Sequence, residues 1–253
     1  DGIVLKYNTS GARQWHSFFG GGNNGDRGQG IALDASNNVY ITGFSGQSWG
    51  SPIVAPAGSS DGVVAKYNGS TGDLVWNTYF GSSGADEGRN VVLDASGNIY
   101  VTGQAAATWG TPISAYSSAI DGALVKLNSS GVRQWNTFLG GTGDDIGYGV
   151  AADGTGNMYI TGSSTATWGT PINAYASGGD GFVAKYNSSG ARQFHTFFGG
   201  TGLDYGRGVT LDASNDIIVS ANSNATWGTP VNAYAGSAGS QNIAVAKFSS
   251  STA

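Results

Sequence analysis

Short apolar runs separated by glycine-rich turns dominate the hydrophobic pattern of this chain. The runs are rich in Val, Ile, Tyr, Phe, Trp and Thr, the residues that favour β-strands. No stretch of about ten residues keeps a helical period, because glycines interrupt every candidate. The pattern therefore predicts an all-β chain.

Several of the predicted strands are apolar on both faces. In one of them, Phe182, Ala184 and Tyr186 alternate with Val183, so both sets of alternating positions are apolar. A strand of this kind has to be covered on both sides. The sequence therefore predicts small sheets that pack face to face on one another.

The same order of runs and turns recurs along the chain. The segment ThrAlaThrTrpGlyThrProIleAsnAlaTyr at 165–175 returns three more times, and its tryptophans lie about 60 residues apart. Repeats begin near residues 1, 61, 121 and 180, with a partial fifth near 241. Such a period is typical of repeat architectures, so residues 1–253 are expected to form a single repeat domain.

Each repeat contains four strand-like runs. In the third repeat they fall at 121–128, 133–140, 147–153 and 158–162. The turn AsnSerSerGly at 128–131 has the residues that tight hairpins need, so its two strands are expected to be antiparallel neighbours. These features predict a β-propeller of four-stranded blades. A parallel β-solenoid is the alternative, but it would need a shorter repeat without tight hairpins.

Three motifs give the chain a resemblance to a known family. They are AspGlyPheValAlaLysTyrAsn at 180–187, ThrPhePheGlyGly at 196–200 and LeuAspAlaSerGlyAsnIleTyrValThrGly at 93–103. Together they resemble the repeat of the bacterial seven-bladed β-propeller (SBBP) family. The resemblance implies a propeller from an extracellular or cell-surface bacterial protein, with a ligand that the motifs do not identify.

Counting strands by that resemblance gives seventeen, which is four blades plus one extra strand rather than seven blades. In one interpretation the ring closes within the chain, and strand 13–20 completes the blade built from 208–213, 217–221 and 242–248. Strand 2–8 then competes with strand 242–248 for one place. In the other interpretation the chain is part of a larger propeller or array. An unpaired edge strand also favours association between chains.

Composition narrows the classes of partner and compartment. The formal charge is −5 with only 11 Lys and Arg, and no basic cluster is present, so nucleic acid is not an expected partner. The absence of cysteine excludes disulfides and thiolate metal sites. No apolar run approaches the ~18 residues of a membrane span. Because the chain starts at Asp1 within a repeat and shows no signal peptide, we expect a processed product or a fragment.

The tryptophan loops are the first candidate site. Strand direction places them at one end of the sheets, together with the glycine loops, and places the short hairpins at the other end. A ring of exposed indoles would stack on sugars, as in a lectin. Alternatively, each indole packs its loop against the neighbouring blade. The residues are Trp49, Trp109, Trp168 and Trp227.

Aspartates in the glycine loops are the second candidate site. If the blades bring them toward a central channel, they provide oxygen ligands for Ca²⁺. Alternatively, each carboxylate accepts backbone N–H groups in its own turn. The residues are Asp26, Asp86, Asp145 and Asp204, with Glu87 and Asp144 as additions. Two further series, Asp34, Asp94, Asp153, Asp212 and Asp1, Asp61, Asp121, Asp180, are expected to stabilise turns.

No motif in the chain predicts catalysis. A GlyXSerXGly elbow, a phosphate loop and a HisGluXXHis motif are all absent. Near-identical repeats also give their carboxylates near-identical surroundings, whereas glycoside hydrolysis needs two unlike ones. His16 and His195 occupy positions where the other repeats have Asn, which is not a zinc site. The repeat-specific residues form no recognisable catalytic pair; they are Arg27, Glu87, Asp144 and Tyr205.

The sequence thus predicts a non-catalytic extracellular propeller that acts as a scaffold or recognition module in a larger surface assembly. Its expected partners are a protein, a second copy of the chain or a glycan. A lectin that uses the tryptophan loops and a structural subunit that associates through an open edge strand are the two alternatives. No cofactor is expected, with Ca²⁺ as the one candidate ion.

Overall fold

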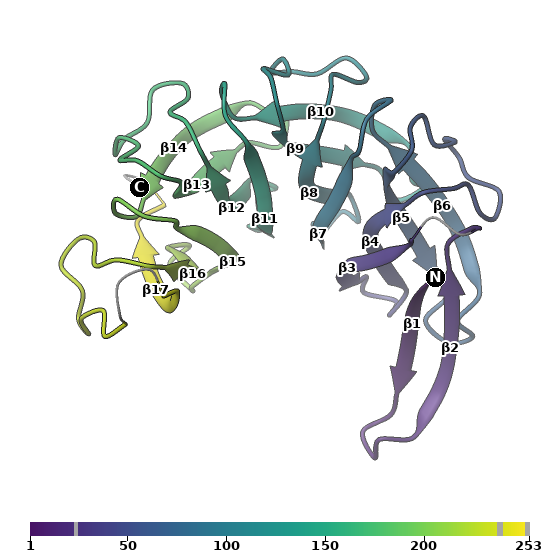
Figure 1. Cartoon of the computed structure of the whole chain (residues 1–253). Helices are drawn as coiled ribbons and strands as arrows, with labels where there is room; N and C mark the ends of the chain where they lie inside the picture. Colours follow the sequence, from purple (N-terminus) through teal and green to yellow (C-terminus); the bar gives the residue numbers. More distant parts are fainter. Residues whose placement is uncertain (23–24, 237–239, 251–253) are drawn as a thin grey trace.

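The computed structural model describes residues 1–22, 25–236 and 240–250. Seventeen strands form five antiparallel sheets that follow one another along an arc (Figure 1). The described residues form no helix, and so none that is long and apolar enough to cross a membrane. The predicted all-β repeat architecture is confirmed.

The five sheets follow the order of the chain. The hairpin sheet contains β1 (Gly2–Tyr7) and β2 (Arg13–Phe19). The first blade contains β3 (Arg27–Leu33), β4 (Val39–Ser45), β5 (Asp61–Tyr67) and β6 (Leu74–Phe80). The second contains β7 (Glu87–Leu93), β8 (Ile99–Ala105), β9 (Asp121–Leu127) and β10 (Arg133–Leu139). The third contains β11 (Asp145–Ala152), β12 (Met158–Ser164), β13 (Asp180–Tyr186) and β14 (Arg192–Phe198). The end sheet contains β15 (Tyr205–Leu211), β16 (Ile217–Ser223) and β17 (Asn242–Phe248).

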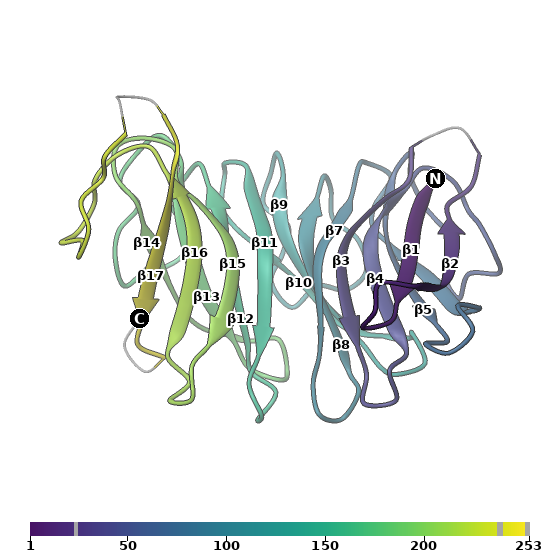
Figure 2. The ribbon, with the colours of Figure 1, turned by 90° about the horizontal axis from the view of Figure 1, so that it is seen from below.

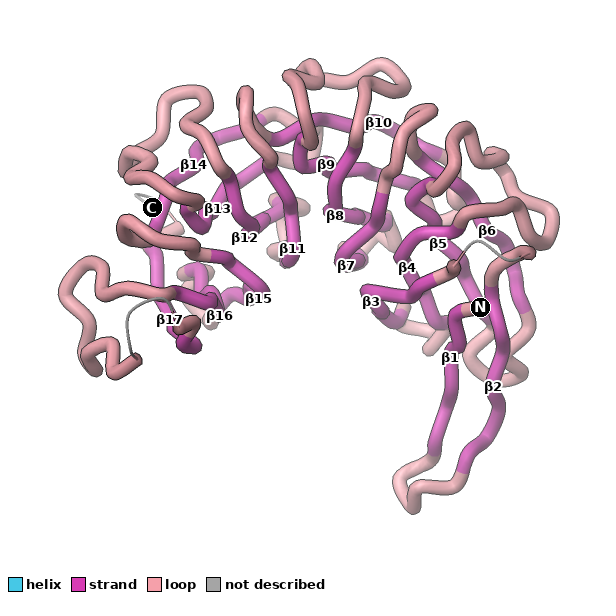
Figure 3. The backbone as a smooth tube through the Cα atoms, viewed as in Figure 1, coloured by secondary structure: helices cyan, strands magenta, loops and turns pink. Residues whose placement is uncertain are grey.

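Within each blade the spatial order of the strands is the chain order. Strands β3, β7, β11 and β15 face the middle of the arc, and β6, β10 and β14 lie on its outside (Figure 1). Short hairpins join the first strand to the second and project from one end of the sheets (Figure 2). The connections from the second strand to the third contain the tryptophans and form the largest loops (Figure 3).

Each hydrophobic core lies between two neighbouring sheets. Tyr40, Val64 and Phe80 of the first blade pack against Ile99 and Val125 of the second blade. We call the side of a sheet that contacts the next sheet in chain order its forward face, and the opposite side its rear face. This packing explains why the strands are apolar on both sides, since every interior sheet is covered twice.

A glycine near the start of the third strand makes room for the outer strand. A Cβ on Gly62 would lie 2.3 Å from Cε2 of Phe80, and a Cβ on Gly181 would lie 2.3 Å from Cε2 of Phe198. The phenylalanine rings therefore lie directly on the glycine backbone. This contact explains why the glycine recurs at the same position in the repeats.

The arc is open between the hairpin sheet and the end sheet (Figure 1). Strand β2 pairs with β1, with Val4 opposite Ser17. Strand β17 pairs with β16, and no described strand pairs with its other edge. The interpretation in which strand 13–20 completes the blade of 208–213, 217–221 and 242–248 is therefore wrong, because strand 2–8 takes it as partner. The described part has three complete blades, a two-stranded sheet and a three-stranded sheet, and so does not show the seven blades of the family name.

Candidate functional site

The innermost strand of every blade carries a β-bulge at a position where the repeats differ. In β3, the pairing with β4 passes from Gly28 to Gly30 and leaves the residue between them without a partner. The same irregularity occurs in β7, β11 and β15. A bulge changes the direction in which its extra side chain points, and bulges are common beside functional sites. The four unpaired residues, called the bulge row below, are Gln29, Arg89, Tyr148 and Arg207.

Glycines beside the bulges let neighbouring inner strands approach each other. A Cβ on Gly30 would lie 2.8 Å from Cα of Asn90, and a Cβ on Gly149 would lie 3.1 Å from the carbonyl oxygen of Arg207. A larger residue at either glycine would separate the strands. The close approach brings bulge residues of neighbouring blades into contact.

Tyrosine rings and guanidinium groups meet at the middle of the bulge row. Cζ of Arg207 lies 4.7 Å from the centroid of the Tyr148 ring and 4.8 Å from that of Tyr205. Cζ of Arg89 lies 5.6 Å from the Tyr148 ring. Cations are attracted to the faces of aromatic rings at these distances. The side chain of Arg207 is thus oriented by two rings while it stays exposed.

Arg89 is neutralised by Glu87 of its own strand and donates to Gln29 of the bulge row. Its Nη2 lies 2.8 Å from Glu87 Oε2, and its Nη1 donates to Gln29 Oε1 at 3.1 Å. Gln29 in turn donates to Glu87 Oε2 at 3.0 Å. Two of the repeat-specific residues thus contact arginines of their own strands: Glu87 contacts Arg89, and Tyr205 contacts Arg207.

Two other arginines of the inner strands have no carboxylate partner among the described residues. Arg27 lies over the ring of Phe44 at 5.8 Å, and Nε of Arg207 donates to Asn222 Oδ1 at 2.9 Å. Both are exposed. Guanidinium groups bind carboxylate and sulfate groups through paired, charge-assisted hydrogen bonds. The inner strands therefore offer exposed cations beside aromatic rings, although the chain has a net charge of −5.

The predicted tryptophan site is largely filled by the protein itself. Trp109 is 9% exposed and Trp168 is 4% exposed, and the other two tryptophans are half-buried. Three of the indoles pack on the last phenylalanine of the preceding sheet. Ring centroids are 5.5 to 6.1 Å apart in the pairs Phe19–Trp49, Phe80–Trp109 and Phe198–Trp227. The packing interpretation describes this geometry, and the glycan-binding role of the tryptophans stays a prediction.

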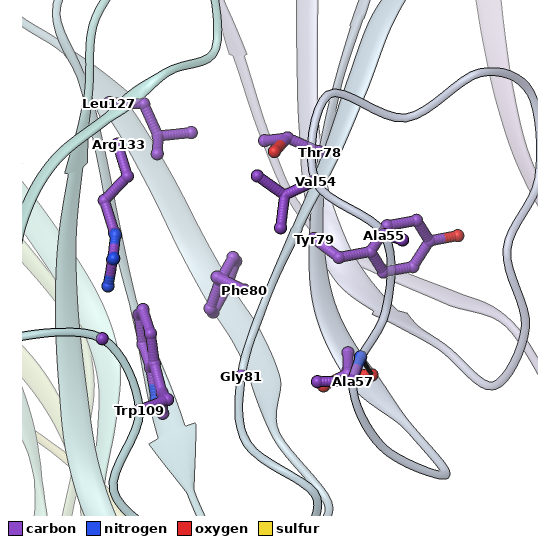
Figure 4. Close-up of a pocket in the computed structure, with 12 residues that line it drawn as sticks. Val54, Ala55, Ala57, Thr78, Tyr79, Phe80, Gly81, Trp109, Leu127 and Arg133 are labelled. Atoms are coloured by element: carbon purple, nitrogen blue, oxygen red, sulfur yellow. Dashed lines mark hydrogen bonds between the residues drawn. The ribbon is translucent and has the colours of Figure 1, made fainter.

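Trp109 also borders a pocket between the first and second blades (Figure 4). Trp109, Phe80 and Arg133 line one part of it, and Val54 and Ala55 of the preceding tryptophan loop line another. Cζ of Arg133 lies 5.4 Å from the Trp109 ring. The pocket is thus mostly apolar, with the cation of Arg133 and the buried carboxyl group of Asp61 in its lining.

The four glycine-loop aspartates are buried, each in its own repeat: Asp26, Asp86, Asp145 and Asp204. Three of them accept backbone N–H groups of their loop: Ser82 to Asp86 at 2.7 Å, Gly141 to Asp145 at 2.9 Å and Gly200 to Asp204 at 2.9 Å. Among the described residues, no group of three or more His, Cys, Asp and Glu side chains could hold a metal ion. The predicted Ca²⁺ site that these four would share is therefore not formed.

Instead, a loop aspartate lies beside the aspartate that begins a third strand of the preceding blade. The backbone N–H of Asp145 donates to Ile120 at 2.7 Å, which places Asp145 next to Asp121. Burial and the charge of Asp121 raise the pKa of Asp145 to about 7, and burial raises the pKa of Asp121 to about 6. Both side chains are at most 1% exposed. They are therefore structural acids that a substrate does not reach.

His195 and the second aspartate series have packing and turn roles. The imidazole of His195 stacks on Trp168 at 3.9 Å, and its Nε2 lies 2.7 Å from the Trp168 carbonyl oxygen. Asn136, the equivalent residue, donates to the Trp109 carbonyl at 3.1 Å. A carboxylate oxygen accepts the N–H groups two and four residues further on in four turns, which begin at Asp34, Asp94, Asp153 and Asp212.

The bulge row was missed by sequence reasoning. The sequence does contain a signal for it. Each inner strand has two small residues separated by one position, as Gly28 and Gly30 are, and the residue between them differs in chemistry from repeat to repeat. Residues that serve packing between blades are nearly the same in every repeat, as the tryptophans are. Variation at one structural position therefore indicates a role other than packing.

Comparison with solved structures and curated proteins adds little about function. No curated protein sequence matches the chain. One similar solved structure is the tail fiber of Staphylococcus aureus phage P68, with 14% sequence identity and a TM-score of 0.28. The similarity covers 91% of this chain and 51% of that chain, so this chain spans about half of its length. A TM-score this low carries no argument about fold or function.

Comparison with protein families agrees with the architecture. The family described as "Beta-propeller repeat" (SBBP) matches three times, at residues 14–46, 75–108 and 134–167. Each match runs from the outer strand of one sheet, through the glycine loop, into the first two strands of the next sheet. These elements recur with the same pairing in the structure. The chain therefore contains three SBBP β-propeller repeats within residues 14–167.

Proposed function

We propose that this chain is a non-catalytic recognition module of an extracellular or cell-surface assembly, and that its inner strands bind glycans with carboxylate groups. The observation that carries the proposal is the exposed Arg207 between the rings of Tyr148 and Tyr205. The packed blades hold the Arg207 guanidinium group in place between these rings.

The chemistry of the inner strands favours an acidic sugar. Arg27 and Arg207 provide guanidinium groups without carboxylate partners, which suit the carboxylate of a uronic acid. Tyr148 and Tyr205 provide aromatic surface, on which the apolar face of a sugar ring packs. A neutral sugar would contact only the aromatic surface and would gain nothing from the guanidinium groups, so we expect it to bind more weakly.

The distribution of titratable groups supports a non-catalytic role. Asp121 and Asp145 have strongly raised pKa values, as acid catalysts often do, but they are at most 1% exposed. His195 is equally buried. None of these groups is exposed, so none can contact a ligand bound on the inner strands.

Binding of galacturonate oligosaccharides, measured by calorimetry at low salt, tests the proposal. We expect binding that weakens with salt, and weaker binding of neutral oligosaccharides of the same length. Arg27→Gln and Arg207→Gln should each weaken binding by about 10- to 100-fold, since a hydrogen bond to a charged group contributes ~1.5–3 kcal/mol. Arg13→Gln is the control, because Arg13 is exposed on β2 away from the inner strands.

The alternative glycan site is the pocket beside Trp109. If Arg27→Gln and Arg207→Gln bind normally while Arg133→Gln does not, the site is that pocket and the assignment to the inner strands is wrong. If no acidic oligosaccharide binds, the glycan role is wrong for both surfaces.

A further inference from the structure

The charged side chains of the four inner strands follow one order along the arc. Apart from the buried Asp145, they are Arg27 on β3, Glu87 and Arg89 on β7, and Arg207 on β15. These strands face the middle of the arc (Figure 1). A pair of opposite charges therefore lies between two arginines.

Hydrogen bonds hold the central pair of charges together. Nη2 of Arg89 lies 2.8 Å from Glu87 Oε2 and donates to Gln104 Oε1 at 2.9 Å. Gln29 bridges the pair from the first blade, since it donates to Glu87 Oε2 and accepts from Nη1 of Arg89. We call Gln29, Glu87 and Arg89 the neutral centre. Strand β7 belongs to a blade with a neighbouring sheet on each side, so these contacts lie well inside the arc.

Arg27 borders a pocket beside the neutral centre. The pocket has a volume of about 360 Å³, and its lining includes Arg27, Phe44 and the three side chains of the neutral centre. A Cβ on Gly28 would lie 3.0 Å from Cζ of Phe19, in the hairpin sheet. Because successive side chains of a strand point to opposite sides, Arg27 lies on the forward face, toward the second blade. The second blade therefore sets its surroundings.

Arg207 lies on the other side of the neutral centre and has similar surroundings. Its guanidinium group contacts two tyrosine rings, as that of Arg27 contacts Phe44. A uronate carboxylate can pair with either arginine. A carboxylate placed between them would instead lie beside the charge of Glu87, which repels it. A hydroxyl group both donates and accepts hydrogen bonds, so an uncharged sugar suits that position.

We propose that the inner strands select an acidic glycan in which uronates alternate with uncharged sugars. Arg27 and Arg207 bind two uronates, and the neutral centre faces the uncharged part of the glycan between them. Glu87 determines the specificity, because it cancels the charge of Arg89, which would otherwise attract a further carboxylate. This inference rests on the proposed function, since it requires that glycans bind on the inner strands.

Two forms of one hexasaccharide test the proposal by calorimetry at low salt. The first is hexagalacturonate, and the second is the same hexamer with every second carboxyl group converted to a neutral methyl ester. We expect the half-esterified hexamer to bind about 5- to 10-fold more tightly, because the fully charged one places a carboxylate beside Glu87. The fully esterified hexamer should bind most weakly, since it offers no carboxylate to either arginine.

Variants of the neutral centre show whether Glu87 causes this preference. Glu87→Gln leaves Arg89 without its carboxylate and should remove the preference, whereas Arg89→Gln leaves Glu87 uncompensated and should increase it. The double variant is neutral again and should regain the wild-type preference, which damage to the fold would not produce. Asp73→Asn is the matched control, because it removes the same charge from an exposed residue between β5 and β6. It should keep the preference of the wild type.

The outcomes separate this inference from the proposed function. If wild type binds hexagalacturonate as tightly as the half-esterified hexamer, and Arg27 and Arg207 are still required, the proposed function stands and this inference is overturned. A preference that persists in Glu87→Gln also overturns it, because the preference then has another cause. If neither charged hexamer binds, both proposals are wrong. Circular dichroism checks that each variant is folded.

Discussion

Asp61 and Asp86, from neighbouring blades, lie against the same glycine. A Cβ on Gly81 would lie 2.5 Å from Oδ1 of Asp61 and 2.8 Å from Oδ2 of Asp86. Gly81 also has a φ of +151°, which other residues rarely adopt. Burial raises the pKa of both carboxyl groups, and the charge of Asp86 raises that of Asp61 further. Each interface between complete blades thus depends on a glycine loop and on buried acids.

The buried acids predict that stability falls as the pH rises from about 4 to about 7. The folded chain holds the proton of Asp145 up to its pKa of about 7, whereas the unfolded chain releases it near its ordinary pKa of about 4. The stabilisation is therefore complete at low pH and is lost through this window, at ~1.4 kcal/mol per pKa unit. Asp145→Asn should flatten the decrease in the free energy of unfolding, measured with urea at several pH values.

Asp144→Asn is the control for that experiment, because Asp144 is the exposed neighbour. It should keep most of the pH dependence, because the charge of Asp144 raises the pKa of Asp145 less than burial does. If Asp145→Asn and the wild type lose stability in parallel, the buried carboxyl group does not hold a proton.

Asp153 should show the opposite dependence. Burial alone would raise its pKa, but hydrogen bonds from Asn157 and Thr155 outweigh burial and lower it to about 2. The contribution of Asp153 to the free energy of unfolding is therefore complete above its ordinary pKa and is lost as the pH falls toward 2. Asp153→Ala should cost ~1–2 kcal/mol at neutral pH, with a difference that shrinks in acid. A penalty that is constant down to pH about 2 would contradict this account.

His195→Asn should improve stability at mildly acidic pH. Burial lowers the pKa of His195 to about 4, so the folded chain resists protonation that the unfolded chain accepts near its ordinary pKa of 6.5. The contribution of the neutral imidazole is thus lost as the pH falls from 6.5 toward 4. Asn should keep the hydrogen bond to Trp168, as Asn136 does to Trp109. Melting temperatures at about pH 5 should rise relative to wild type, and His16→Asn, at an exposed site, should change nothing.

Gly181→Ala should destabilise the third blade by ~1–3 kcal/mol. The new methyl group would lie 2.3 Å from a buried phenylalanine ring, so Phe198 would have to move into the interface with the end sheet. Gly154→Ala is the control, because nothing lies within 4 Å of a Cβ there. Equal urea midpoints of unfolding for Gly181→Ala and Gly154→Ala would show that the Phe198 ring moves aside without a loss of stability, which would contradict this account.

Strands and blades were predictable because their causes are local. Val183 and Phe182 are apolar on opposite faces of one strand, which requires covering sheets on both sides, and AsnSerSerGly at 187–190 closes its hairpin. Closure of the arc was not predictable from the same pattern. By sequence, strand 13–20 has two possible partners, strand 2–8 and strand 242–248, and its pairing with strand 2–8 follows from the short loop that joins the two strands. Closing a short hairpin loses less chain entropy than joining strands at opposite ends of the chain.

The bulge row was not predictable because a bulge is a property of two strands. Arg89 and Tyr148 lie in glycine-rich stretches that look like loops, and only their pairing with β8 and β12 shows that one residue is extra. The contacts of Arg207 with Tyr148 also join two different blades. The repeat-specific Glu87 and Tyr205 were noticed in the sequence, but their partners depend on how closely the inner strands approach.

Hydroxyl-radical footprinting of the chain with and without a galacturonate oligosaccharide tests the central claim most directly. The method reports the solvent exposure of aromatic side chains, and both candidate surfaces contain them. Binding at the inner strands should protect Tyr148 and Tyr205 and leave Trp109 and Trp227 unchanged. Protection of the tryptophans with unchanged reactivity of both tyrosines would contradict the account and assign recognition to the tryptophan loops.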